Sequence, residues 1–236
     1  MKITTIIFDL DGTLLPMDTD AYDKTYFKLL SSHLAQYGYE PEDFTKAIWS
    51  GCKAMVNNDG NKTNEEVFWD RFAEIYGDKA RLDHKYFAEF YEAPYDKIRP
   101  TTSFNPLVPP FVKSLKDKGY RLIIATNPLF PARAIFKRIE WAGLDRDDFE
   151  LVTTYENSYH AKPSTDYYQD IVDQLKLDPS RCIMIGNNVD EDMVASKLGM
   201  KVYLITDYLL NPHDKDINAY PHGTFSQMMD FVNNLD

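Results

Sequence analysis

Two aspartates, Asp9 and Asp11, follow an apolar run near the start of the chain. The run Ile3–Phe8 is rich in β-branched and aromatic residues, which predicts a buried strand. Side chains at positions i and i+2 of an extended chain point the same way, so the two carboxylates could meet just beyond the strand. They would repel each other unless a cation or a shared proton intervened, and Mg²⁺ is a natural partner that also attracts phosphate. The alternative is an ordinary turn, because Asp11-Gly12 is a common turn pair.

A second candidate pair, Thr126 and Asn127, follows the apolar run Leu122–Ala125. A threonine hydroxyl, together with backbone N–H groups of a loop, can hold a phosphate oxygen. Ligands of a doubly wound sheet bind beyond the carboxyl ends of its central strands, so this pair could lie near the two aspartates. Taken alone, the pair is also typical of a simple turn.

Such residues need a sheet to bring them together, and most of the chain alternates strand-like with helix-like segments. The strand-like runs are Ile3–Phe8, Arg121–Thr126, Leu151–Thr154, Cys182–Gly186 and Val202–Thr206. The helical patterns are Phe111–Lys118, Ala132–Ala142, Thr165–Leu175, Met193–Leu198 and a terminal one over Phe225–Val232. This alternation predicts an α/β fold, a doubly wound parallel sheet with helices on both faces. The stretch Thr206–His222 is expected to be a loop.

One long stretch breaks the alternation. From about Asp18 to Lys97 there is no convincing strand, and the apolar residues follow helical spacing. Thr63 and Glu66 have the pattern of a capping box, and the residues Gly38–Pro41 and Gly77 suit helix ends. The sequence therefore predicts an all-helical insert. Three aromatic residues are expected in its core: Trp49, Phe68 and Trp69.

The segment Ile6–Leu14 resembles the first motif of the haloacid dehalogenase superfamily, Asp-x-Asp-Gly-Thr after an apolar strand. The resemblance implies a Rossmann-like core in which Asp9 is the nucleophile. It also implies that Asp9 contacts Mg²⁺, and that Asp11 is the general acid and base, with its backbone carbonyl as a further contact to Mg²⁺. A carboxylate is a weak nucleophile, so a metal and nearby cations must offset its repulsion from a phosphate dianion. An aspartyl-phosphate intermediate would split one hard displacement into two easier ones.

Two later segments resemble further motifs of the family. Thr126-Asn127 matches the second motif, and His160–Ser164 resembles the third, a Lys-Pro pair at the start of a helix. The third motif implies that Lys162 pairs with Asp9 and binds the transferring phosphoryl group. The phosphate-binding candidates are Asp11, Gly12, Thr126, Asn127 and Lys162.

The fourth motif departs from the family's pattern. Its usual Gly-Asp pair is here Gly186-Asn187, and an asparagine oxygen can ligate Mg²⁺ but brings no charge. Three acids follow: Asp190, Glu191 and Asp192. Counting back from Gly199 places Glu191 at the usual position of the second acid, whereas the start of the next helix favours Asp192. Asp190 suits the helix dipole. The expected metal ligands are Asp9, Asp11, Asn187 and Asp192.

The insert directly after the first motif resembles the family's helical C1 cap, which closes over the active site. The resemblance implies a core domain of residues 1–17 and 98–236 and a cap domain of residues 18–97. In the cap, Asn57, Asn58 and Lys62 could contact substrate, although they also suit a solvated loop.

Composition limits the class of protein. A chain of 236 residues with 44% hydrophobic content suits one large α/β domain or a core with an insert. A net charge of −11 argues against nucleic acid or an anionic membrane as main partners but permits a small anion in a local pocket. Cys52 and Cys182 make a disulfide scaffold improbable and fit a reducing compartment. With no membrane-length apolar run and no room for a signal peptide, a cytoplasmic location is expected.

The predicted function is that of a Mg²⁺-dependent phosphatase acting on a small phosphorylated metabolite. A phosphohexomutase of the same fold is one alternative, but it needs particular cap contacts. A phosphate- or metabolite-binding module, weakened by Asn187, is another. A haloacid dehalogenase is disfavoured, because it would have no use for an acid at Asp11. The sequence makes no prediction of the oligomeric state.

Overall fold

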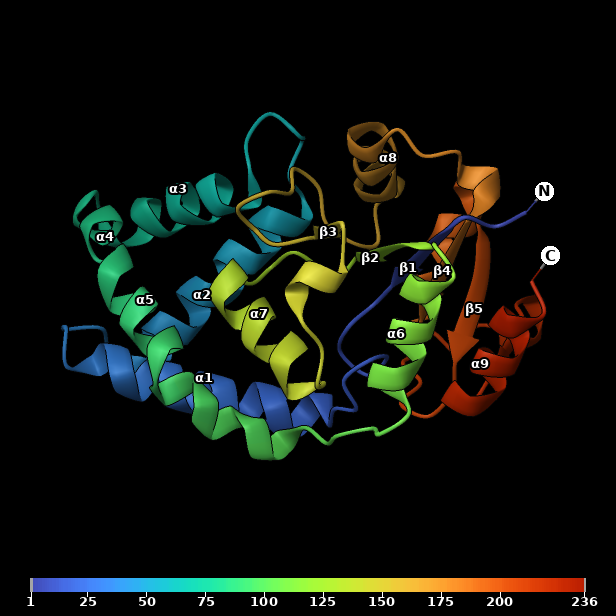
Figure 1. The fold of residues 1–236 in the computed structure, drawn as a ribbon. Coiled ribbons are helices and arrows are strands. Elements are labelled where there is room, and N and C mark those ends of the chain that lie inside the picture. Colours follow the sequence, from blue (N-terminus) through green and yellow to red (C-terminus); the bar gives the residue numbers. More distant parts are fainter. Residues whose placement is uncertain (1, 236) are drawn as a thin grey trace.

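A six-stranded parallel sheet forms the centre of the molecule in a computed structural model that describes residues 2–235 (Figure 1). The strand order is β3-β2-β1-β4-β5-β6, and every neighbouring pair is parallel. The strands are β1 Thr5–Phe8, β2 Arg121–Ile124, β3 Leu151–Val152, β4 Cys182–Gly186, β5 Lys201–Ile205 and β6 His222–Gly223. The predicted fold class is confirmed, and β1 lies at the centre, where ligand-binding crevices form.

The sixth strand is a correction. The sequence predicted a loop over Thr206–His222, yet His222 and Gly223 pair with Leu204 and Ile205 at the edge of the sheet. Two residues are too few for a period-2 pattern to be visible in the sequence. The short 3₁₀-helix η5 (Ile217–Ala219) precedes this strand.

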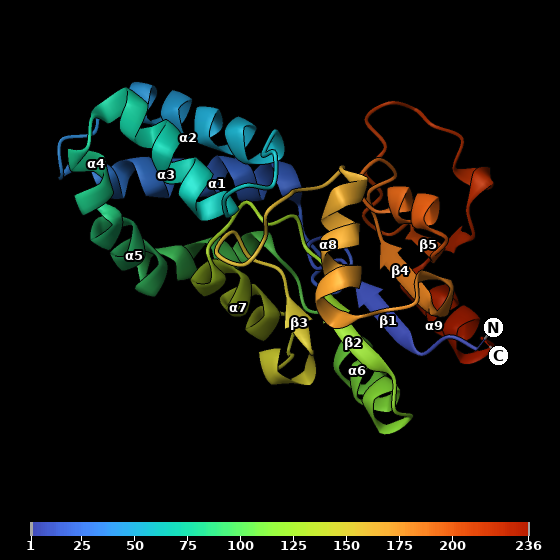
Figure 2. The ribbon, with the colours of Figure 1, turned by 90° about the horizontal axis from the view of Figure 1, so that it is seen from above.

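Helices cover both faces of the sheet, because alternate residues of β1 are buried on opposite sides. Ile6 and Phe8 belong to one apolar cluster, which includes residues of α6, α7 and α9, whereas Ile7 belongs to another with residues of α8. Figure 2 shows α8 on one side of the strands and α6 with α9 on the other. These helices span α6 Val108–Asp117, α7 Ala132–Trp141, α8 Thr165–Leu175 and α9 Phe225–Asn233. The predicted helix over Met193–Leu198 is a 3₁₀-helix, η4. Two shorter ones are η2 Arg146–Asp148 and η3 Pro179–Arg181.

Between β1 and β2 the chain forms the helical segment, residues 19–101, which lies to one side of the sheet (Figure 1). Its elements are α1 Thr19–Ala35, α2 Pro41–Val56, α3 Asn64–Tyr76, α4 Lys79–Leu82, α5 His84–Glu92 and the 3₁₀-helix η1 Pro94–Thr101. The predicted capping box starts α3: Thr63 Oγ1 accepts from the Glu66 N–H, and the Glu66 carboxylate accepts from the Thr63 N–H. The domain boundary expected at residue 97 falls inside η1.

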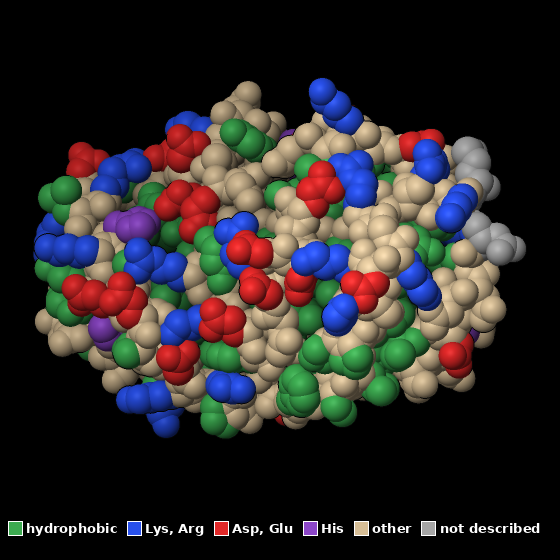
Figure 3. Space-filling model, in the orientation of Figure 1, with side chains coloured by type: hydrophobic (Ala, Val, Ile, Leu, Met, Phe, Trp, Pro, Cys, Tyr) green, Lys and Arg blue, Asp and Glu red, His purple; other side chains and the backbone are tan. Residues whose placement is uncertain are grey.

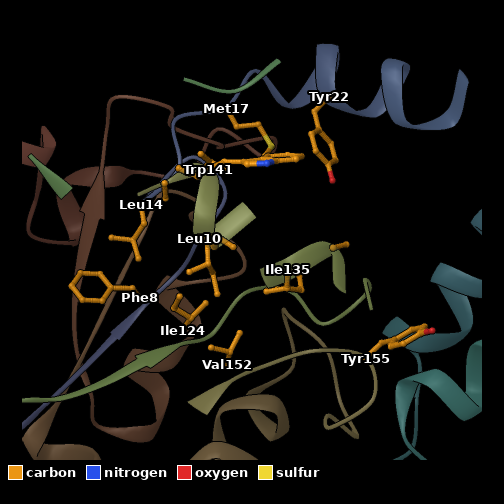
Figure 4. Packing of buried hydrophobic residues seen from close by; sticks show 14 of the residues in the cluster. Phe8, Leu10, Leu14, Met17, Tyr22, Ile124, Ile135, Trp141, Val152 and Tyr155 are labelled. Atoms are coloured by element: carbon orange, nitrogen blue, oxygen red, sulfur yellow. The ribbon is translucent and has the colours of Figure 1, made fainter. Parts of the chain in front are cut away.

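One apolar cluster joins the sheet to the helical segment. Figure 4 shows its buried side chains running from Phe8 on the sheet past Leu10 to Met17 and Tyr22 at the start of α1. Phe68 and Trp69 are buried in the helical segment, as predicted. Trp49 is not, because 54% of its surface is exposed, and its ring stacks on Phe27 instead.

On the face shown in Figure 3, basic and acidic side chains of the described residues are interspersed, with no continuous patch of either sign. Within residues 2–235, none of the helices combines the length and apolar character that crossing a bilayer requires. Both cysteines are free, in agreement with the expected absence of a disulfide scaffold.

Candidate active site

The loop that follows β1 places the first two candidate residues. Asp9 still continues the sheet, since its N–H donates to the Ile185 carbonyl at 2.9 Å, and its side chain is nearly buried. Thr13 Oγ1 donates to Asp9 Oδ2 at 3.0 Å. The loop turns at Gly12, whose φ of +82° lies in the left-handed region. Asp9 is therefore held in one orientation at the carboxyl end of the central strand.

Gly12 has a second reason to lack a side chain. A Cβ there would lie 2.2 Å from Asn187 Nδ2, whereas a Cβ at Gly119, with a similar φ of +81°, would meet nothing within 4 Å. Gly119→Ala is expected to cost about 1–2 kcal/mol from the left-handed backbone alone. Gly12→Ala should cost about 1–3 kcal/mol more, because Asn187 must move. Urea denaturation of the two variants tests this difference; equal losses would show that Asn187 does not constrain the loop.

Lys162 reaches this site from the loop before α8. Its Nζ lies 2.9 Å from Asp9 Oδ1 and 2.6 Å from Asp192 Oδ1, and its side chain is fully buried. Burial disfavours the ammonium, but the carboxylates of Asp192 and Asp9 outweigh it and hold the pKa of Lys162 well above its ordinary value. The lysine therefore stays charged beside Asp9.

Asn187 and Asp192 come from the end of β4 and the turn beyond it. Asn187 Oδ1 accepts from Thr13 Oγ1 at 3.3 Å, while its Nδ2 donates to the Tyr208 carbonyl at 2.6 Å. The Tyr208 carbonyl needs a donor, which an amide supplies and a carboxylate does not. The amide oxygen is thereby turned toward Thr13, the hydroxyl that also contacts Asp9. Asp192 Oδ2 accepts from the Asn188 N–H at 2.9 Å.

The other two acids of this turn have different surroundings. Asp190 forms ion pairs with His213 and Lys215, both of which are largely exposed. Glu191 lines the cavity described below and accepts from Asn127 Nδ2 at 3.1 Å. Burial raises the pKa of Glu191 to about 7, against the opposing charge of Lys162. Of the three acids left open by the sequence, only Asp192 contacts Lys162.

Thr126 and Asn127 lie at the end of β2 and line the same cavity as Asp9 and Asp11. The Thr126 carbonyl is fixed by the hydroxyls of Thr153 and Tyr167, at 2.8 and 2.9 Å. Asn127 Oδ1 is buried and has no hydrogen-bond partner among the described residues. The candidates that follow different strands are thus brought together. By contrast, Asn57, Asn58 and Lys62 are not among the residues that line this cavity.

Arg138, on α7, is a residue that sequence reasoning missed. It is buried, and its Nε lies 3.4 Å from Asp11 Oδ1. Its Nη1 donates to the hydroxyls of Tyr22 and Tyr95, at 2.7 and 3.3 Å. Burial raises the pKa of Asp11 to about 6, although the Arg138 charge opposes the shift. A charged residue within the apolar stripe of α7, between Ile135 and Ile139, was the available signal.

A cavity of about 310 Å³ opens at this site and extends from Asp9 and Asp11 to the helical segment. Six buried side-chain atoms of the described residues lack a hydrogen-bond partner, and all but the Tyr76 hydroxyl belong to residues lining this cavity. They are Asp11 Oδ1, Asn127 Oδ1, Trp69 Nε1, Arg138 Nε and Arg138 Nη2. Asp11 Oδ1 and Arg138 Nε face each other at 3.4 Å, beyond good hydrogen-bond geometry. Since buried polar atoms are normally paired, the remaining three make this cavity the candidate ligand site.

The oxygen donors fit a hard divalent cation. Among the described residues, no three His, Cys, Asp or Glu side chains cluster closely enough to hold a metal by themselves. Mg²⁺ needs fewer, since one or two carboxylates with water and phosphate oxygens usually complete its shell. Asp9 Oδ2 and Asn187 Oδ1 approach the same Thr13 hydroxyl, so two oxygen donors from different loops lie close together. Asn187 is the uncharged member of this donor set, at the position where the resemblance to the fourth motif implies an acid.

Comparison with known proteins identifies the class. The model of the haloacid dehalogenase-like hydrolase family matches residues 3–199, and the chain belongs to this family of hydrolases. A phosphoglycolate phosphatase of Aquifex aeolicus is 27% identical over 236 residues, covering 98% of this chain and 96% of the relative.

Solved structures share the fold. A HAD phosphatase from Thermococcus onnurineus matches with a TM-score of 0.60 at 19% identity, covering 98% of each chain. A 2-haloacid dehalogenase from Pseudomonas syringae matches with a TM-score of 0.65 at 20% identity, covering 99% of this chain and 100% of the other. Since fold neighbours include both kinds of enzyme, the reaction must be argued from the site.

Proposed function

We propose that the protein is a Mg²⁺-dependent phosphatase that hydrolyses a small phosphate monoester through an aspartyl-phosphate. The observation that carries the proposal is the pairing of Asp9 with a buried, charged Lys162 at 2.9 Å, with a second acid, Asp11, two residues further on in the same cavity. Phosphatase-named relatives of the same family agree with it.

In the first step, an Asp9 carboxylate oxygen attacks phosphorus and the bond to the ester oxygen breaks. The electron pair leaves with that oxygen, which takes a proton from Asp11. The raised pKa of Asp11, about 6, keeps a useful fraction of this acid protonated near neutral pH. Lys162, Thr126 and loop N–H groups would hold the phosphoryl oxygens, and such electrostatic positioning supplies most of the catalysis in phosphoryl transfer.

In the second step, water attacks the phosphorus of the aspartyl-phosphate and gives its proton to Asp11. The bond between phosphorus and the Asp9 oxygen breaks, which releases phosphate and restores the carboxylate. Asp9, the backbone carbonyl of Asp11, and Asn187 would hold Mg²⁺. Asp192, also expected as a ligand, has its two carboxylate oxygens bonded to Lys162 and to the Asn188 N–H, so it would act by holding Lys162. When bound, the ion supplies positive charge that offsets the repulsion between the nucleophile and the phosphate dianion.

We further propose that residues 18–97 act as a cap domain over a core of residues 1–17 and 98–236. The cavity is lined by both parts, so closure would exclude bulk water from the reacting atoms. Asp11 separates this proposal from dehalogenation, because a halide leaves without a proton and needs no acid at that position.

The direct test is hydrolysis of p-nitrophenyl phosphate by the purified chain. Turnover is expected with millimolar Mg²⁺, to fall to background when EDTA removes the ion, and to return when excess Mg²⁺ is added. Release of inorganic phosphate measures the reaction. If the chain hydrolyses no phosphate ester under any metal condition yet binds phosphate tightly, it is a binding module and the phosphatase proposal fails.

A further inference from the structure

The cavity has an apolar half, away from Asp9, that phosphoryl transfer itself does not use. Its walls are mainly rings from the helical segment and the loop after β2: Tyr26, Phe27, Trp49, Phe68, Tyr91 and Phe130. This position is the one that a leaving group must occupy when its phosphate lies against Asp9. The side chains that line this half therefore determine which leaving alcohol fits.

The rings present their hydrocarbon surfaces rather than polar groups. The hydroxyls of Tyr26 and Tyr91 bond to each other at 2.7 Å, so their polar tips are already satisfied. The Tyr26 and Phe130 rings meet edge to face, 5.2 Å apart at 73°. Trp49, another residue of the lining, is 54% exposed and stacks on Phe27 with ring centroids 5.0 Å apart. An aromatic ring of a ligand could pack against these side chains in the same edge-to-face or stacked geometries.

The charges around this half disfavour an anionic leaving group. Among the described residues lining the cavity, the helical segment contributes one formally charged side chain, the acid Asp23, and no Lys, Arg or His. Arg138 is the cation of the lining, but its Nε faces the Asp11 carboxylate at 3.4 Å. Arg138 also stacks on Phe130, 4.5 Å from the ring centroid, but the acids Asp9, Asp11, Asp23 and Glu191 outnumber it in the described lining. A carboxylate placed among the rings would lose its hydration and face this excess of acids, which is costly.

The size of the cavity fits one ring. Its volume is about 310 Å³, at the lower end of the range for small-molecule sites. An apolar cavity of about 150 Å³ can hold a benzene molecule, so a phosphoryl group and a single ring fill this space.

We propose, resting on the phosphatase function above, that the substrate is the monophosphate ester of an uncharged alcohol carrying one aromatic ring. Shape and charge then select it together: the rings accept the aryl group, and the excess of acids in the lining disfavours carboxylated esters. The unpartnered Nη2 of Arg138 can donate to a neutral oxygen near the ester.

A matched panel of esters tests the proposal. With Mg²⁺ present, kcat/KM for benzyl phosphate is expected to exceed that for 4-carboxybenzyl phosphate, 2-phosphoglycolate and the ringless isobutyl phosphate by about tenfold or more. Binding gives a readout without turnover. In calorimetry, benzylphosphonate should bind about tenfold tighter than 4-carboxybenzylphosphonate.

Two variants of Trp49 test the role of the rings and of charge separately. Trp49→Ala should lower the benzyl-to-isobutyl ratio of kcat/KM by about tenfold, because one ring of the wall is lost. Trp49→Arg should shift preference toward 4-carboxybenzyl phosphate, because the helical segment contributes no other cation to the lining. Leu82→Ala is the control: Leu82 is an apolar residue on α4, 75% exposed and outside the cavity lining, and its loss should leave both ratios unchanged.

The outcomes separate the two proposals. If the carboxylated ester or 2-phosphoglycolate is turned over as well as benzyl phosphate, the aromatic preference is wrong while the phosphatase function stands. If no ester is hydrolysed, the phosphatase function fails, and the phosphonate affinities still decide whether the apolar half selects an uncharged ring. Equal affinities for the two phosphonates would overturn the proposal.

Discussion

Asp9→Asn is expected to lower kcat for p-nitrophenyl phosphate by about a thousandfold or more, because an amide cannot supply the attacking oxygen. The fold should survive the change. Asparagine has the same size and can still accept from Thr13, and Lys162 keeps its 2.6 Å ion pair with Asp192. Steady-state phosphate release measures the loss, and circular dichroism with urea denaturation checks the fold.

Asp190→Asn is the matched control for that experiment. Asp190 is also an acid near the site, but it pairs with the exposed His213 and Lys215 rather than facing Asp9. Its replacement should change kcat by less than about twofold. An Asp9→Asn protein that keeps more than a tenth of wild-type turnover would exclude Asp9 as the nucleophile.

Lys162→Met is expected to impair both stability and turnover. The side chain is fully buried between the carboxylates of Asp9 and Asp192, so its loss leaves like charges facing each other without a cation. Removing one partner of a buried ion pair typically costs about 3–5 kcal/mol in the free energy of unfolding. Turnover should fall by about a hundredfold to a thousandfold, since a preorganised charge near the phosphoryl oxygens is lost.

Charge and packing can be separated for this residue. Adding Asp192→Asn to Lys162→Met removes one of the two unpaired carboxylates, so part of the lost stability should return. Lys215→Met, at the exposed partner of Asp190, should change stability only slightly. If the double variant is less stable than Lys162→Met alone, repulsion between the carboxylates is not the cause of the loss.

The sheet and the helical insert could be predicted because their signals are local. Strands β1 and β4 are unbroken apolar runs, and the capping box at Thr63 marks the start of α3. The pairing of Asp9 with Lys162 was expected from the resemblance of His160–Ser164 to the family's third motif, and the ion pair at 2.9 Å agrees with it. The geometry agrees with the predicted constellation, although the role of each residue stays a proposal.

Other features depend on contacts between residues that are distant in sequence. Arg138 meets Tyr22, 116 positions away, and no periodicity in either helix shows that pairing. The exposure of Trp49 depends on how α1 and α2 pack, so its aromatic character alone predicted burial wrongly. The orientation of the Asn187 amide is set by the Tyr208 carbonyl, 21 residues later.

Arg138 ties the two parts of the molecule to the proton donor. The guanidinium is held by Tyr22 of α1 and Tyr95 of η1, while its other edge faces Asp11 in the core. If the helices swung outward, the hydroxyls would withdraw and water would reach both the guanidinium and Asp11. Hydration would then lower the affinity of Asp11 for its proton, because burial is the main cause of the shift. The protonated fraction of Asp11 would then depend on whether the helical segment covers the site. A substrate that bound without this cover would have a leaving oxygen that Asp11 protonates less readily.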